Sequence, residues 1–186
     1  MDLARVEKAL TMAAKAHRNQ NRKQTDTPYI THPVAVAFIL LQENCSEDLI
    51  IAGLLHDVVE DSPVGIEEIT VEFGDKVAEI VRACTEPSKF MQWEKRKQII
   101  LQRIRSGSSD FKMVACADKL HNIESMIADY LDVGDRLWKR FSRGRDKQEW
   151  YYRSLAGSFT HGLDGASKVL LFEKYHQRVD LLFGEM

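Results

Sequence analysis

The sequence has few cysteines and no spacing that would join them. Cys45, Cys84 and Cys116 are odd in number and far apart, which argues against both a disulfide framework and a thiolate zinc site. Cys116 lies in an apolar stretch, where a small buried hydrophobic residue is the favoured interpretation. This use of cysteine is typical of a protein of the cytoplasm.

Long apolar runs are missing as well. The longest, such as residues 34–41, are too short to cross a bilayer. Charged residues, among them Asp2, Arg5 and Lys8, punctuate the start of the chain, so it carries no secretory signal pattern. We expect no membrane partner and a cytoplasmic location.

The chain also lacks an excess of positive charge. Its 26 lysines and arginines are balanced by 28 acidic residues, and the formal net charge is -2. Such a balance gives no overall attraction to nucleic acid, and we expect no nucleic-acid partner. Basic residues do gather in the segment 136–147, whose role the sequence leaves open, as it does the oligomeric state.

What the chain does have is helical periodicity. Apolar residues recur at spacings of three and four along most of its length, whereas no alternating strand pattern, internal repeat or low-complexity linker stands out. A chain of 186 residues, 44% of them hydrophobic, is long enough for one sizeable core. We predict a single all-α domain over residues 1–186. The expected helices span residues 3–18, 34–42, 47–60, 66–73, 75–83, 93–104, 113–130, 147–159 and 165–183.

The stretch LLHDVVED, residues 54–61, places a histidine and three carboxylates at the end of an apolar helix. Four-residue spacing relates His56 to Glu60 and Asp57 to Asp61, so on a helix these side chains gather in one region. Carboxylates this close repel one another unless a cation neutralises them. The pattern favours His56 and Asp57 as metal ligands, with Glu60 and Asp61 beyond them.

Taken alone, a histidine–aspartate pair is more often a surface cap or a satisfied core pair. Two further residues favour a metal. His32 precedes Pro33, which suits the start of a helix, and Asp118 lies inside the apolar stretch 113–120. Two imidazoles and two carboxylates from three separate helices can therefore form one site.

Three multi-residue motifs carry a resemblance to a known family. They are RKQTDTPYITHP at residues 22–33, LLHDVVED at 54–61 and ADKLHN at 117–122. Together they resemble the HD-domain metal phosphohydrolases, and most closely the hydrolase domain of RelA/SpoT homologues. The resemblance implies an HD-domain helical fold, with a metal and catalytic core over about residues 17–130 and C-terminal helices over about 135–186 completing the substrate cleft. It also implies a small alarmone hydrolase without a synthetase domain.

A ligand set of His32, His56, Asp57 and Asp118 mixes nitrogen and oxygen donors without a thiolate. Such a set favours Mn²⁺, Fe²⁺ or Zn²⁺ over a soft metal, and of these three we predict Mn²⁺. A metal of this kind polarises a phosphoryl oxygen and lowers the pKa of its bound water from ~15.7 toward ~7. By resemblance to the family, the acidic pair that follows the ligands, Glu60 and Asp61, orients this water or takes its proton.

The expected substrate contacts rest on other residues. Arg22 and Lys23 read as a solvated loop in isolation, but they resemble the family's phosphate-binding RK loop. Asn122 follows Asp118 by four residues and Ser125 follows Asn122 by three, so the three share one helix face, where Asn122 is suited to a ribose. Arg145 is predicted at the distal phosphate, although a helix with a basic outer face would look the same.

Together with the resemblance, these residues predict a Mn²⁺-dependent hydrolase that removes the 3′-pyrophosphate of a guanosine or adenosine alarmone. One alternative keeps the metal site and makes the protein a phosphatase of NADPH or another nucleotide. Another is a non-catalytic HD regulatory module that binds a nucleotide. Glu124 stands where the family commonly has arginine, so the base preference stays open. For Lys119 and His121 the sequence does not decide between solvent-facing roles and roles behind the ligands.

Overall fold

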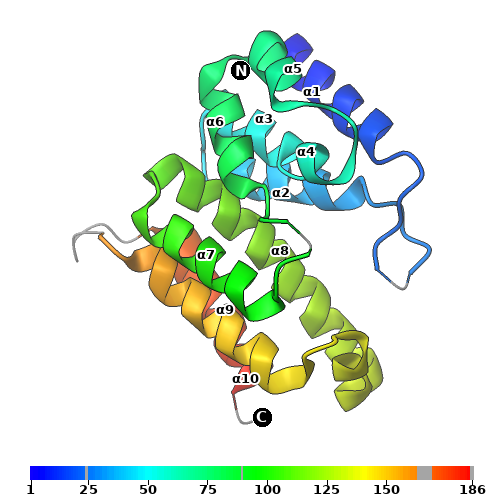
Figure 1. Cartoon of the computed structure of the whole chain (residues 1–186), viewed down its shortest axis with the longest axis vertical. Coiled ribbons are helices and arrows are strands. Elements are labelled where there is room, and N and C mark those ends of the chain that lie inside the picture. The colour runs from blue at the N-terminus through cyan, green and yellow to red at the C-terminus, as the bar shows by residue number, and fades with distance from the viewer. Residues whose placement is uncertain (24, 89, 163–168, 185–186) are drawn as a thin grey trace.

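The computed structural model describes residues 1–23, 25–88, 90–162 and 169–184, and within these ranges the chain is helical (Figure 1). No described residue belongs to a strand, and one isolated β-bridge joins Asn21 to Pro28. The all-α prediction is confirmed. The elements are α1 Leu3–Ala16, α2 Thr31–Gln42, α3 Glu47–Leu55, α4 Val58–Asp61, α5 Ile66–Phe73, α6 Asp75–Cys84, α7 Trp93–Ser106, α8 Ser109–Val133, the 3₁₀ helix η1 Gly134–Arg140, α9 Gly144–Thr160 and α10 Leu170–Phe183.

The long helix α8 joins the two halves of the molecule. On one side it packs against α2 and α3, and on the other against α10, which in turn packs on α9. Figure 1 shows α1 to α6 gathered in one half and α7, α9 and α10 in the other. None of the helices in the described ranges is long and apolar enough to cross a membrane.

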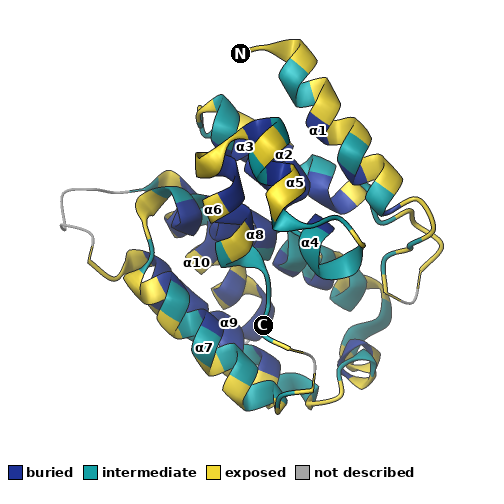
Figure 2. Cartoon of the chain, turned by 45° about the horizontal axis from the view of Figure 1, so that its top comes forward, coloured by how far each residue is buried: buried dark blue, intermediate teal, exposed yellow. Residues whose placement is uncertain are grey.

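The core is centred on α3 and α8, as the dark blue segments of Figure 2 show. Every residue of α3 from Leu49 onward is buried. Gly53 lets α2 approach closely, since a Cβ at this position would lie 2.6 Å from Cδ1 of Leu40 and 3.3 Å from Cγ1 of Val36. Gly53 therefore allows α2 and α3 to pack closely. His32 lies in the first turn of α2 and His56 directly follows α3.

The prediction of one continuous helix over residues 47–60 is wrong, because the helix breaks at the predicted metal ligands. The helix α3 ends at Leu55 and α4 begins at Val58, with His56 and Asp57 between them. Nδ1 of His56 lies 2.8 Å from the carbonyl oxygen of Gly53. In an unbroken helix the amide of Asp57 would donate to that carbonyl, so the histidine side chain competes with the backbone.

Several helix ends also differ from prediction. The helix α2 begins at Thr31, two residues before Pro33, and the proline remains in the first turn, where its missing N–H is harmless. The helix α8 begins at Ser109 because the side chain of Ser108 accepts the amide hydrogen of Phe111. The 3₁₀ helix η1 was not predicted. Of the predicted helix 165–183, residues 165–168 lie outside the described ranges.

Candidate metal centre and substrate cavity

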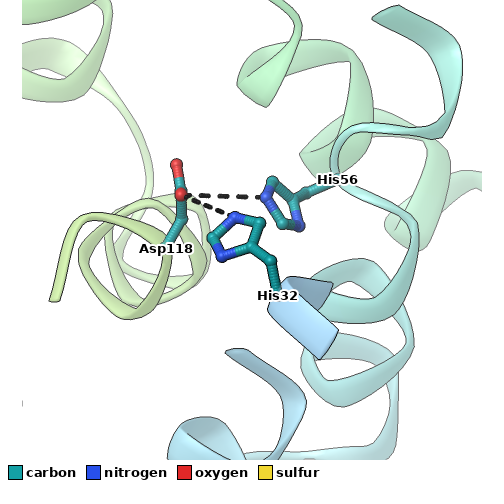
Figure 3. A group of neighbouring side chains, drawn as sticks. All are labelled: His32, His56 and Asp118. Carbon is teal, nitrogen blue, oxygen red and sulfur yellow. Dashed lines mark ion pairs between the residues drawn. The ribbon is translucent and has the colours of Figure 1, made fainter. Parts of the chain in front are cut away.

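The four predicted ligands meet in one place. His32 comes from the first turn of α2 and Asp118 from the middle of α8, while His56 and Asp57 lie in the break between α3 and α4. Nε2 of His32 is 3.2 Å from Oδ1 of Asp118, and Nε2 of His56 is 3.8 Å from the same oxygen (Figure 3). Oδ2 of Asp57 lies 3.1 Å from Nε2 of His56.

The donor atoms fit a divalent cation. Ligand atoms of His32, His56 and Asp118 all lie within 4.8 Å of one another. Because the carbonyl of Gly53 can only accept, Nδ1 of His56 carries the hydrogen of the neutral ring, and Nε2 offers a lone pair. This Nε2 is buried and makes no hydrogen bond to any described residue. An unsatisfied buried nitrogen is costly, and coordination to a metal would satisfy it.

The electrostatics of the centre also favour a cation. Burial alone would lower the pKa of His56, but the charges of Asp57 and Asp118 outweigh it and raise that pKa to about 9. Burial alone would raise the pKa of both carboxyls. His56 lowers the pKa of Asp57, and Lys119, whose Nζ lies 2.7 Å from Oδ2 of Asp118, lowers the pKa of Asp118. Two ionised carboxylates thus attract a positive charge, which a metal can supply in place of the His56 proton.

Two of the ligands are held by neighbours to which the sequence gave no role. The hydroxyl of Tyr29 donates to Oδ2 of Asp57 at 2.6 Å, and Nδ1 of His121 lies 2.7 Å from Nδ1 of His32. Tyr29 precedes His32 by three residues within the first motif. This spacing was the only sequence signal that could have placed Tyr29 beside the metal ligands. Burial, followed by the charges of His32 and Arg22, lowers the pKa of His121 to about 4.

The acidic pair Glu60 and Asp61 forms the end of α4, directly after the break that holds the ligands. Oε2 of Glu60 accepts the backbone N–H of Glu86 at 3.2 Å. Desolvation by burial raises the pKa of Glu60 above its ordinary value, which suits a group that takes a proton near neutral pH. The carbonyl of Asp61 accepts a hydrogen bond from Gln20 at 2.7 Å. The part played by both carboxylates in proton transfer stays a prediction.

A cavity of about 490 Å³ adjoins the metal centre, and four of the predicted substrate residues line it: Arg22, Lys23, Asn122 and Ser125. Nη2 of Arg22 donates to Oδ1 of Asn122 at 3.0 Å. Nδ2 of Asn122 in turn donates to Oδ1 of the ligand Asp118 at 2.6 Å. Arg22 is therefore connected to the metal centre through the side-chain amide of Asn122.

Further lining of this cavity comes from the C-terminal region that was expected to complete the substrate cleft. It includes Arg140 and the apolar side chains of Leu137, Phe141 and Tyr152. Nζ of Lys23 donates to the carbonyl of Arg140 at 2.9 Å and lies 5.7 Å from the ring centre of Phe141. A cavity lined by both cations and aromatic rings suits a ligand with both phosphates and a base.

Arg145 does not join this cavity. Its guanidinium donates to Oε2 of Glu149 at 3.4 Å and to the carbonyl of Phe183 at 3.3 Å, and it lies over the ring of Trp138. The basic residue of this region that lines the cavity is Arg140, which is paired with Asp129 at 2.6 Å. A basic segment alone could not indicate which arginine turns inward.

The HD domain family matches residues 9–141 of the chain. Human MESH1, named as a guanosine-3′,5′-bis(diphosphate) 3′-pyrophosphohydrolase, is 36% identical over 128 residues, which cover 67% of this chain and 71% of the relative. The Drosophila melanogaster protein of the same name is 36% identical over 126 residues, 66% of this chain and 70% of its own length. A Streptomyces coelicolor protein named GTP pyrophosphokinase is 36% identical over 127 residues, 67% of this chain but 15% of its own length.

Solved structures of other proteins share the fold. The crystal structure of lmo0812 from Listeria monocytogenes superposes with a TM-score of 0.77 at 35% identity, covering 83% of this chain and 99% of its own. The structure of a metazoan orthologue of SpoT, described as hydrolysing ppGpp, superposes with a TM-score of 0.74 at 28% identity. It covers 94% of this chain and 96% of its own.

Proposed function

Because this chain belongs to the HD domain family, we propose that it is a metal-dependent pyrophosphohydrolase of an alarmone such as guanosine 3′,5′-bis(diphosphate). In this reaction water attacks the 3′-pyrophosphate, and pyrophosphate and the nucleoside 5′-phosphate or 5′-diphosphate are released. The relatives that carry this activity in their names are 36% identical or more to the chain over about two thirds of its length.

One observation carries the proposal beyond family membership. The cavity and the metal centre share their side chains, since three residues that line the cavity also contact predicted ligands. Tyr29 contacts Asp57, His121 contacts His32 and Asn122 contacts Asp118. A phosphate bound in the cavity therefore lies beside the ligand set, as phosphoester hydrolysis requires.

The residues of the centre divide the chemistry among them. His32, His56, Asp57 and Asp118 would hold the metal, which when bound polarises a phosphoryl oxygen and lowers the pKa of water. Glu60, with its raised pKa, accepts a proton from the attacking water, and Asp61 helps to orient that water. We propose Mn²⁺ as the metal, since donors of this mixed set suit it.

The substrate is held by charge at one end and by apolar contacts at the other. Arg22 and Lys23 neutralise the pyrophosphate, because both line the cavity and guanidinium and ammonium groups form the strong class of hydrogen bonds to phosphate. Asn122 and Ser125 lie on the same helix and face the ribose. Phe141 and Tyr152 supply the aromatic surface for the base.

We further propose that the protein acts in the cytoplasm. The three cysteines are free thiols, and Cys116 is fully buried with a pKa raised by desolvation. Unpaired thiols are typical of a reducing compartment.

The direct test uses protein that has been stripped of metal and resupplied with Mn²⁺. Its substrates, assayed in parallel, are the guanosine alarmone ppGpp, the adenosine counterpart of ppGpp, and NADPH. We expect pyrophosphate from one or both alarmones. Phosphate from NADPH alone would retain the metal site and overturn the substrate. Nucleotide binding without any product would point instead to a regulatory module.

A further inference from the structure

His32 and His121 are joined by a hydrogen bond between ring nitrogens as well as by ring packing. The two Nδ1 atoms are 2.7 Å apart and the ring centres 4.9 Å apart. Two ring nitrogens at this distance share one hydrogen, because two hydrogens would clash and two lone pairs would repel. The direction of this hydrogen bond therefore fixes the tautomer of both rings.

The metal centre determines that direction. Nε2 of His32 faces the centre, 3.2 Å from Oδ1 of Asp118, and must offer a lone pair if His32 is to bind a cation. The hydrogen of the neutral His32 ring then lies on Nδ1, which donates to Nδ1 of His121. A histidine ligand that donates through its second nitrogen is held in one orientation.

The same hydrogen bond determines what His121 offers to the cavity. With Nδ1 as acceptor, the neutral ring of His121 carries its hydrogen on Nε2. Among the residues that the structure describes, this Nε2 has no hydrogen-bond partner. His121 lines the cavity beside Arg22 and Asn122, which places its ring next to a ligand bound there.

We propose that His121 has two linked roles: Nδ1 positions the metal ligand His32, and Nε2–H donates a hydrogen bond to an anionic oxygen of the bound nucleotide. This inference rests on the proposed function and extends it to a residue behind the ligand set. A carboxylate in place of His121 would hold His32 equally well, but it would repel phosphate. A neutral imidazole holds the ligand and still presents a donor to an anion.

Two substitutions separate the roles, because each amide reproduces one nitrogen of the ring. In His121→Asn the side-chain oxygen can occupy the position of Nδ1, so the acceptor for His32 is kept and the donor at Nε2 is lost. In His121→Gln the longer amide reaches the position of Nε2, so the donor is kept and the acceptor is lost. Each variant is therefore the control for the other.

The first readout is Mn²⁺ affinity, measured by calorimetric titration of metal-free protein without nucleotide. We expect His121→Gln to bind Mn²⁺ about 10–100-fold more weakly, as loss of an outer partner of a metal-bound histidine does, and His121→Asn to bind it as the unmodified protein does. Equal affinity in all three proteins would overturn the positioning role. The thermal unfolding of the metal-free variants, compared with that of the unmodified protein, shows whether the fold is retained.

The second readout is KM for the alarmone at saturating Mn²⁺. We expect His121→Asn to raise KM about 10-fold to 100-fold, the range for one hydrogen bond to a charged group, and His121→Gln to raise it less. An unchanged KM in His121→Asn would overturn the donor role. If the unmodified protein bound no Mn²⁺ or released no pyrophosphate, the proposed function itself would fail, which is a different result from either of these.

Discussion

The metal centre and the substrate cavity lie side by side but are built differently. His32 and His56 are 1% and 2% exposed, and they project from helix ends packed into the core. Arg22 and Lys23 lie on a loop, and Lys23 contacts Arg140 and Phe141, which lie in or beside a 3₁₀ helix. From this difference we infer that hydrolysis depends on the buried groups, whereas substrate choice depends on the more exposed segments beside them.

Removal of a ligand should have the largest effect, because it acts on the buried side. We expect Asp57→Asn to abolish turnover by loss of the metal, since the neutral amide no longer offers a charged oxygen beside His56. Mn²⁺ affinity should fall by more than the factor of about 10–100 that even an outer partner contributes. Calorimetric titration measures this, and Asp75→Asn, an exposed aspartate on α6, is the control. Tight Mn²⁺ binding by Asp57→Asn would contradict its assignment as a ligand.

Loss of the proton acceptor should come next. We expect Glu60→Gln to lower kcat by about 100-fold to 10,000-fold, the usual contribution of general-base catalysis, while Mn²⁺ affinity stays unchanged. Steady-state release of pyrophosphate, together with a metal titration, separates this variant from Asp57→Asn. If Mn²⁺ affinity fell in parallel with kcat, Glu60 would belong to the ligand set instead.

Removal of a cation from the substrate cavity should weaken substrate binding without changing Mn²⁺ affinity. We expect Arg22→Ala to raise KM by about 10-fold to 100-fold, which corresponds to the ~1.5–3 kcal/mol of a hydrogen bond to a charged group. Mn²⁺ affinity should stay within a factor of about three, since Arg22 reaches the ligand Asp118 only through Asn122. A large loss of Mn²⁺ affinity would mean that the two regions are not separable.

The smallest effect is expected outside the cavity. Arg145→Ala should change KM by no more than about twofold, within the ±0.5 kcal/mol typical of surface substitutions, because Arg145 contacts Glu149 and Phe183 and does not line the cavity. The matched variant Arg140→Ala removes a guanidinium that does line it and should raise KM more. The opposite order would restore Arg145 to the substrate site.

The same division explains how much the sequence could predict. His56 and Asp118 stand out because polar groups inside apolar runs must be compensated, and His32 stands out because it precedes Pro33 at the start of a helix. The structure brings the three together. The helix break at His56 was missed, since it depends on a side chain that competes for the carbonyl of Gly53. The position of Arg140 in the cavity lining was also missed. It depends on the path of the 3₁₀ helix η1, which the periodicity of the sequence does not predict.

The most direct test of the whole account is a titration of Mn²⁺ into metal-free protein, with bound metal and the rate of pyrophosphate release from ppGpp followed together. We predict that the rate is negligible without metal and rises in proportion to the metal bound at the buried centre, and that Asp57→Asn, which disrupts this centre, loses both signals. Pyrophosphate release that persists in metal-free protein, or that is unaffected by Asp57→Asn, would contradict the claim that the buried histidine and aspartate set is the hydrolytic centre.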